Sequence, residues 1–173
     1  ELAAQFFGEG LGARPLVELA RDAISECKDV PGALASVQEP ARTLEQAARA
    51  LRAAMDSLPQ RGAAWRALEE VEIELAFNAL AEALRTLRDT LDPLRETAPG
   101  FDACHLRAND QLGRLQRWLG KVGSVSTFET KVDTDPTFAV HWYELTPRGF
   151  RLQRTPLDVS APLRRHREDS RAA

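Results

Sequence analysis

The sequence has few of the residues on which catalytic sites and disulfide-stabilised domains depend. Its 173 residues include only two cysteines, Cys27 and Cys104, with no C-x-x-C spacing. This suggests neither a disulfide framework nor a cysteine metal site, and we expect two core thiols, with an incidental disulfide as the alternative. The three histidines, at 105, 141 and 166, belong to different predicted elements, and no phosphate-binding loop, zinc-protease motif or nucleophile elbow occurs. These absences predict a chain that has no catalytic site and holds no metal or cofactor of its own.

Aromatic residues and long apolar runs are also scarce. Aromatics make up 6% of the chain, and no run reaches the roughly 18 apolar residues of a membrane span, so we expect no membrane partner. The bias toward Ala, Leu, Arg and Glu favours helix over sheet. Charge is uneven: residues 1–100 hold 11 basic and 17 acidic residues (−6), whereas residues 101–173 hold 12 and 9 (+3). A polyanion would therefore favour the second half.

The dominant pattern is an apolar seam between residues 63 and 94. Its members recur at steps of three and four: Phe77, Leu80, Leu84, Leu87, Leu91 and Leu94. This period predicts one long helix that buries a stripe against its neighbours. Leu68, Val71 and Leu75 are expected to extend the stripe upstream, after a loop at residues 59–62. At ~1.5 Å per residue, the helix would be about 45–50 Å long, which implies an elongated bundle.

Three further segments show the helical period. A helix over residues 15–27 is expected after a glycine-rich turn at residues 8–12. A second helix should follow a capping box at Ser36–Glu39 and run to about Leu58, with Arg42, Arg49 and Arg52 on its exposed side. A third is expected over residues 102–122.

The pattern changes after Gly123, where apolar and polar residues alternate on both sides of a turn at residues 146–149. This predicts a β-hairpin within residues 137–156. Its apolar face needs a packing partner, and one interpretation is that this partner belongs to a part of the protein outside the sequence. The predicted fold is therefore mainly α: an elongated antiparallel helical bundle with one β-hairpin near the C-terminus. We divide it into a helical bundle, residues 1–136, and residues 137–173, which hold the hairpin and the start of a helix.

The helix over residues 102–122 has one apolar face and one cationic face. Its basic residues are Arg107, Arg114, Arg117 and Lys121, with Trp118 at the border. One interpretation is an ordinary solvated face. The other is a nucleic-acid site in which the cations follow the phosphates and Trp118 stacks on a base.

Both ends of the chain carry a family resemblance. The opening ELAAQFFG and the stretch LVELARD at residues 16–22 are similar to the sequence that follows the DEAH box in DinG/YoaA-type helicases, bacterial relatives of XPD in superfamily two. The stretches VHWYE at residues 140–144 and FRLQRTPLDVS at residues 150–160 resemble that family's approach to its Ser-Ala-Thr motif. The resemblance implies an Arch-domain insertion, a piece of a longer protein that helps frame the opening for single-stranded DNA.

The resemblance also implies a cytoplasmic bacterial location and a parent ATP-dependent DNA helicase of the repair or replication type. ATP and Mg²⁺ would bind the parent's motor domains, which would also be partners of this segment. An iron–sulfur cluster is possible in the parent, upstream of this segment. The expected function is non-catalytic guidance of single-stranded DNA. The alternative is a helical protein–protein interaction module without DNA contact.

Overall fold

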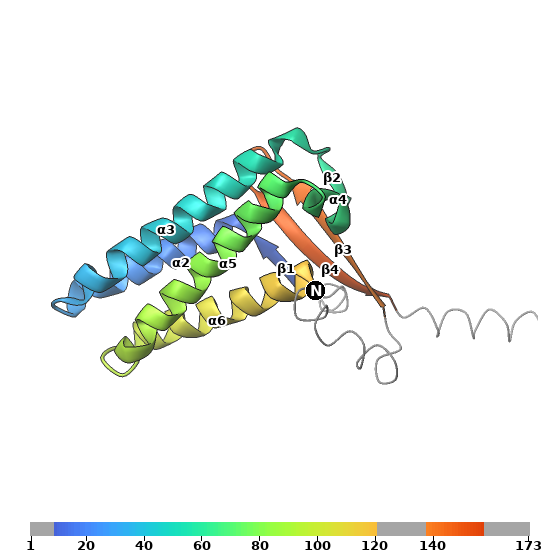
Figure 1. Ribbon diagram of the computed structural model, residues 1–173. Coiled ribbons are helices and arrows are strands. Elements are labelled where there is room, and N and C mark those ends of the chain that lie inside the picture. Colours follow the sequence, from blue (N-terminus) through green and yellow to red (C-terminus); the bar gives the residue numbers. More distant parts are fainter. Residues whose placement is uncertain (1–8, 121–137, 158–173) are drawn as a thin grey trace, which may run out of the picture.

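The computed structural model describes residues 9–120 and 138–157, which form an elongated helical bundle with a small sheet across one end (Figure 1). The long helices are α2 (Ala13–Glu26), α3 (Ala33–Ala54), α5 (Val71–Leu91) and α6 (Pro99–Leu119). Shorter elements are α4 (Ala64–Leu68) and the 3-10 turns η1 (Cys27–Asp29), η2 (Met55–Ser57) and η3 (Asp92–Leu94). The strands are β1 (Glu9–Gly12), β2 (Arg61–Ala63), β3 (Phe138–Leu145) and β4 (Phe150–Leu157). The predicted fold class is confirmed.

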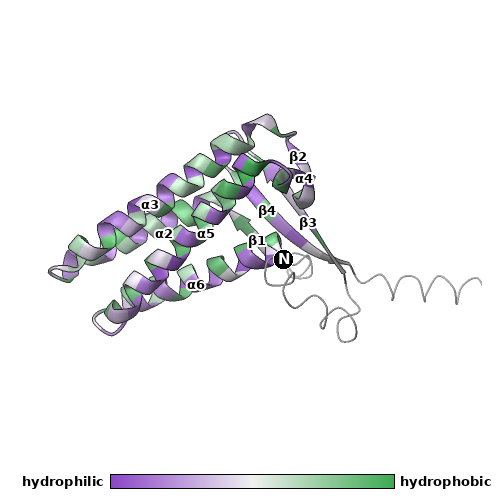
Figure 2. Cartoon of the chain, in the orientation of Figure 1, coloured by the Kyte–Doolittle hydropathy of each residue, from purple (hydrophilic) through white to green (hydrophobic). Residues whose placement is uncertain are grey.

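Each long helix buries one seam with the spacing of a packed bundle. In α5 the buried seam is Ile73, Phe77, Leu80, Leu84, Leu87 and Leu91. In α3 it includes Val37, Ala41, Leu44, Ala48 and Leu51, and it continues to Met55 in η2. Hydrophobic residues therefore alternate with hydrophilic ones along each helix and together line one face of it (Figure 2). A stripe of this width buries one face against neighbouring helices.

Two helix predictions need correction. The expected single helix over residues 63–94 is interrupted at Glu69 and Glu70, between α4 and α5. Val71 and Leu75 lie outside the seam, with 67% and 60% of their surface exposed. The reason is register, because four residues before Phe77 is Ile73, which is 1% exposed.

The second correction concerns the start of α3. This helix begins at Ala33 after Gly32, whose φ of 85° lies in the left-handed region that glycine tolerates. The Ser36 hydroxyl donates to the Ala33 carbonyl at 3.0 Å, so Ser36 lies inside the helix and does not cap it. The capping-box prediction at Ser36–Glu39 was therefore wrong.

The sheet has four antiparallel strands in the order β1-β4-β3-β2. The β3–β4 hairpin is confirmed, with Leu145 opposite Phe150. The two edge strands occupy segments predicted to be a turn (residues 8–12) and a loop (residues 59–62), and both contain glycine. Glycine is required in β2 because a Cβ on Gly62 would lie 2.8 Å from the Tyr143 hydroxyl oxygen.

The bundle itself is the packing partner of the hairpin. Tyr143, Leu145, Phe150 and Leu152 are buried against it, whereas Val140, on the other face, is 40% exposed. Two contacts hold the end of β3 that leads into the turn. The Arg52 guanidinium donates to the Thr146 carbonyl at 3.0 and 3.1 Å, and the Tyr143 hydroxyl donates to the Pro59 carbonyl at 3.0 Å. The hairpin tip is therefore attached to α3.

Among the helices that the structure describes, none combines the length and the apolar character needed to cross a membrane.

Candidate nucleic-acid interface

The cationic row predicted on α6 is partly engaged in contacts within the chain. Arg107 forms an ion pair with Asp22 of α2, with 2.8 Å between Nη1 and Oδ2. Arg114 pairs with Asp110 at 2.9 Å and donates from Nη1 to the Gly10 carbonyl at 3.0 Å. These two side chains join α6 to α2 and β1. Arg117 is exposed, and Lys121 lies outside the described residues.

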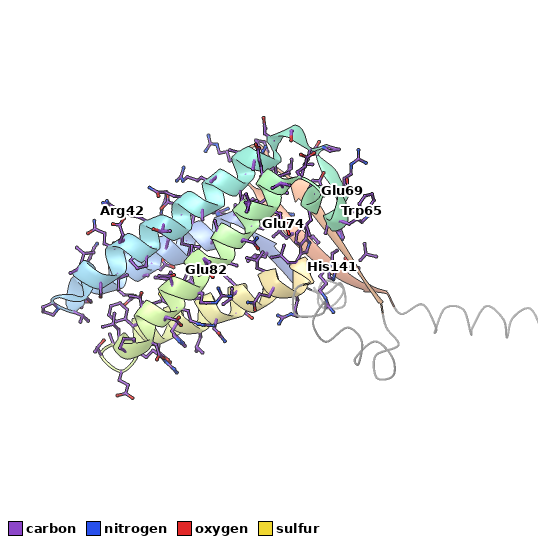
Figure 3. All side chains as sticks on the ribbon, viewed as in Figure 1. Arg42, Trp65, Glu69, Glu74, Glu82 and His141 are labelled. Carbon is purple, nitrogen blue, oxygen red and sulfur yellow. The ribbon has the colours of Figure 1, made fainter. Side chains whose placement is uncertain are left out.

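Trp118 does not border the row, because it is a core residue. Only 2% of its surface is exposed, and its ring centroid lies 5.1 Å from that of Phe77. Its indole Nε1 donates to the Trp142 carbonyl at 2.9 Å, and His141 Nδ1 lies 2.9 Å from the Trp118 carbonyl. Figure 3 shows His141 at the end of α6 that meets the sheet. The predicted role of Trp118 in stacking on a base was therefore wrong.

A different surface gathers more cationic side chains. An open groove of about 980 Å³ lies where β1, the start of α2, α3 and the tip of the hairpin meet. Its lining includes five arginines and one glutamate: Arg14, Arg21, Arg49, Arg148, Arg151 and Glu18. We call this surface the arginine groove. Its elements are far apart in the sequence, so it exists only in the folded chain.

Three of these arginines form ion pairs with two carboxylates. Arg14 Nε lies 3.1 Å from Glu18, and Arg21 Nη2 lies 3.3 Å from Glu45, which Arg49 also contacts. The hydrogen bond from Arg49 is the largest cause that lowers the pKa of Glu45 below its ordinary value, although burial of that carboxylate opposes the effect. Five guanidinium groups therefore share two carboxylates, and the groove keeps a positive excess.

The positive excess is concentrated at the hairpin tip and the start of α2. Arg148 and Arg151 are exposed and form no ion pair with any other described residue. The first turn of α2 has no acidic residue and no side-chain cap at Gly12, so its free N–H groups add partial positive charge. Guanidinium groups bind phosphate oxygens through charge-assisted, often bidentate hydrogen bonds. The arrangement suits a phosphate backbone.

The sequence did not predict the groove, although it did indicate the positions of two of its arginines. Arg49 was placed correctly on the exposed side of its helix, and the turn containing Arg148 was identified. The missing information was the approach of α2 to the hairpin tip, which depends on pairing of β1 with β4. Strands of three or four glycine-containing residues give no alternating pattern to detect.

The described residues offer no group of three or more His, Cys, Asp or Glu side chains that could hold a metal ion. Cys27 and Cys104 are both buried, and burial raises the pKa of each thiol. Thiols of this kind are poor nucleophiles. Two cysteines also fall short of the four thiolates that usually bind an iron–sulfur cluster.

Comparison with known proteins gives one informative match. No protein-family model matches the chain, and no solved structure matches it. The chain is 29% identical over 164 residues to "ATP-dependent DNA helicase YoaA" of Escherichia coli (strain K12). The match covers 92% of this chain but 23% of that helicase, so the chain spans less than a quarter of its relative's length. Along nearly its whole length, the chain is therefore similar to one segment of an ATP-dependent DNA helicase.

Proposed function

We propose that this chain is a non-catalytic, Arch-like segment of an ATP-dependent DNA helicase and guides single-stranded DNA along the arginine groove. The similarity to a helicase supports the class of parent protein. The groove supports the contact with DNA. In this proposal ATP and Mg²⁺ bind the motor domains of the parent, and the segment hydrolyses no ATP itself.

The observation that carries the proposal is the excess of arginine over carboxylate in one groove. Single-stranded nucleic acids are held without sequence preference by positively charged grooves that follow the backbone. The chain as a whole has a net charge of −3, which opposes long-range capture of a polyanion. We therefore expect weak binding by the isolated chain and stronger binding when the motor domains hold the same strand.

The groove is a better candidate than the row on α6. A phosphate would have to displace Asp22 from Arg107, and the Gly10 carbonyl and Asp110 from Arg114. The second displacement would also disturb β1. Arg148 and Arg151 require no such exchange, because neither forms an ion pair with another described residue.

The test measures the salt dependence of binding to a labelled oligothymidylate by fluorescence anisotropy. For single strands, the slope of log K against log salt is about −0.7 for each phosphate contact. The double variant Arg148→Gln/Arg151→Gln should therefore reduce the magnitude of the slope by about 1.4 and weaken binding at low salt. Far-UV circular dichroism should be unchanged, because both side chains are exposed.

A matched control removes two other exposed arginines that form no ion pair with a described residue, Arg42 and Arg66. Arg42 lies on α3 away from the sheet (Figure 3), and Arg66 lies on α4. The double variant Arg42→Gln/Arg66→Gln carries the same change in net charge and should retain the wild-type slope. An equal loss in both variants would mean that only net charge matters, and the groove would not be the site.

A further inference from the structure

The junction of α4 and α5 exposes an unusual concentration of apolar surface. Trp65, Val71 and Leu75 are 65%, 67% and 60% exposed, and they are three of the six large hydrophobic residues that are exposed among the described residues. We define the α4–α5 patch as these three residues together with Glu69, Glu70, Glu72 and Glu74. Figure 3 shows Trp65, Glu69 and Glu74 at this end of the molecule. Exposed apolar clusters with a polar rim mark interaction surfaces.

The fold does not require these apolar side chains. Val71 and Leu75 lie one turn apart on the outer side of α5. The core contacts of this helix are made by its inner side, which includes Ile73 and Phe77. The acidic residues have a partial structural explanation, because Glu72 and Glu74 in the first turn of α5 interact favourably with the helix dipole. That explanation does not account for a tryptophan and two aliphatic side chains in water.

The charges around the patch indicate the kind of partner. Glu69, Glu70, Glu72 and Glu74 are exposed and form no ion pair with another described residue. A partner that covers the apolar residues must therefore approach four uncompensated carboxylates. A cationic surface would gain from this approach, whereas a nucleic acid would be repelled. A second copy of the chain is also disfavoured, because a two-fold contact would bring two sets of glutamates together.

We propose that the α4–α5 patch docks a positively charged amphipathic segment of a protein partner, with Trp65 and Leu75 as the apolar anchors. The patch adjoins β2, whereas the arginine groove adjoins β1, at the opposite edge of the sheet. The two surfaces can therefore be occupied together. This inference does not depend on the proposed contact with DNA.

The test uses the whole chain and a synthetic amphipathic helix with leucines on one face and lysines on the other. Binding should shift the tryptophan emission, because Trp65 is 65% exposed, whereas Trp118 is buried and Trp142 is half-buried. Wild-type protein should bind with an affinity that falls as salt is raised. The variant Trp65→Ala/Leu75→Ala should lose about tenfold or more in affinity, as for central anchor residues, with binding followed by calorimetry. Glu70→Gln/Glu72→Gln/Glu74→Gln should weaken binding and reduce its salt dependence.

Two controls separate this surface from general stickiness and from the groove. Leu34→Ala/Leu106→Ala removes two exposed leucines elsewhere, 43% and 56% exposed, and should leave the affinity unchanged. Arg148→Gln/Arg151→Gln should also leave it unchanged, so a failure of DNA binding would not affect this result. The proposal is overturned if the wild type does not bind the peptide, or if the leucine control loses as much affinity as the patch variant. Sedimentation showing a wild-type dimer that the patch variant loses would instead assign the patch to self-association.

Discussion

Replacement of Trp118 distinguishes a core role from a role in binding nucleic acid. In the structure the indole is 2% exposed, stacks near Phe77 and donates to the Trp142 carbonyl at 2.9 Å. It therefore links α5, α6 and β3. A residue in this position should contribute to stability and have no direct effect on DNA affinity.

The size of the effect follows from these contacts. Truncation of a buried tryptophan to alanine costs about 3–5 kcal/mol, from lost transfer free energy and the cavity left behind. Loss of the donor to the Trp142 carbonyl adds about 1 kcal/mol. The total approaches the 5–15 kcal/mol by which domains are usually stable, so Trp118→Ala should be largely or wholly unfolded at moderate temperature. Trp118→Phe keeps most of the ring volume and should cost about 1–3 kcal/mol.

The informative measurement is urea denaturation of Trp118→Phe, followed by far-UV circular dichroism, beside its affinity for a labelled oligothymidylate. We expect a lower midpoint, an unchanged m-value and wild-type affinity under native conditions. The reasoning would be refuted if Trp118→Phe had wild-type stability but bound DNA more weakly. That result would support the original prediction that the indole is exposed and stacks on a base.

Two further predictions concern the sheet. Gly62→Ala should cost about 1–3 kcal/mol in urea denaturation, because the new Cβ would lie 2.8 Å from the oxygen of the fully buried Tyr143. Gly10→Ala, where the nearest atom is the flexible end of Gln153 at 3.1 Å, should cost less, and equal losses would contradict this account. Burial of His141 lowers its pKa, so the unfolded chain binds a proton more readily below about pH 6.5. The free energy of unfolding should therefore fall as the pH drops from 7 through this range, and it should fall less in the variant His141→Asn. Equal pH dependence of stability in the wild type and the variant would contradict this prediction.

The packed faces of the long helices were predictable where the apolar period is dense. Phe77, Leu80, Leu84, Leu87 and Leu91 are all buried as the sequence indicates. Their spacing leaves only one face on which a helix can bury them. The fold class followed from the same signal, because such a face needs neighbouring helices.

The position of Trp118 was harder to predict because its seam contains a polar residue. From Phe101, steps of three and four lead through Cys104, Ala108, Gln111 and Leu115 to Trp118, and all are buried. In the sequence, Leu112, Leu115, Leu119 and Val122 suggest an apolar face that is rotated away from this seam and leaves Trp118 at its border. Gln111 is buried despite its amide, so hydropathy alone concealed the seam.

The arginine groove and the two edge strands depend on contacts between distant segments. Gly10 pairs with Gln153 and Gly62 with Tyr143, across 143 and 81 positions of sequence. Neither pairing is encoded by a local pattern. The proposed DNA contact of the α6 row and the domain boundary at residues 136–137 stay predictions.

The pairing of β1 with β4 has a mechanical consequence. Glu9 lies opposite Arg154, and Gly12 lies opposite Arg151, so the start of β1 and the end of β4 lie at the same end of neighbouring strands. Tension that pulls these two ends apart would load the hydrogen bonds between the strands one after another, as in a zip, and not all at once. Tension along the bundle axis would instead meet the packed seams of four helices. Under tension, the pairing between β1 and β4 should therefore break first, while the helical bundle stays folded.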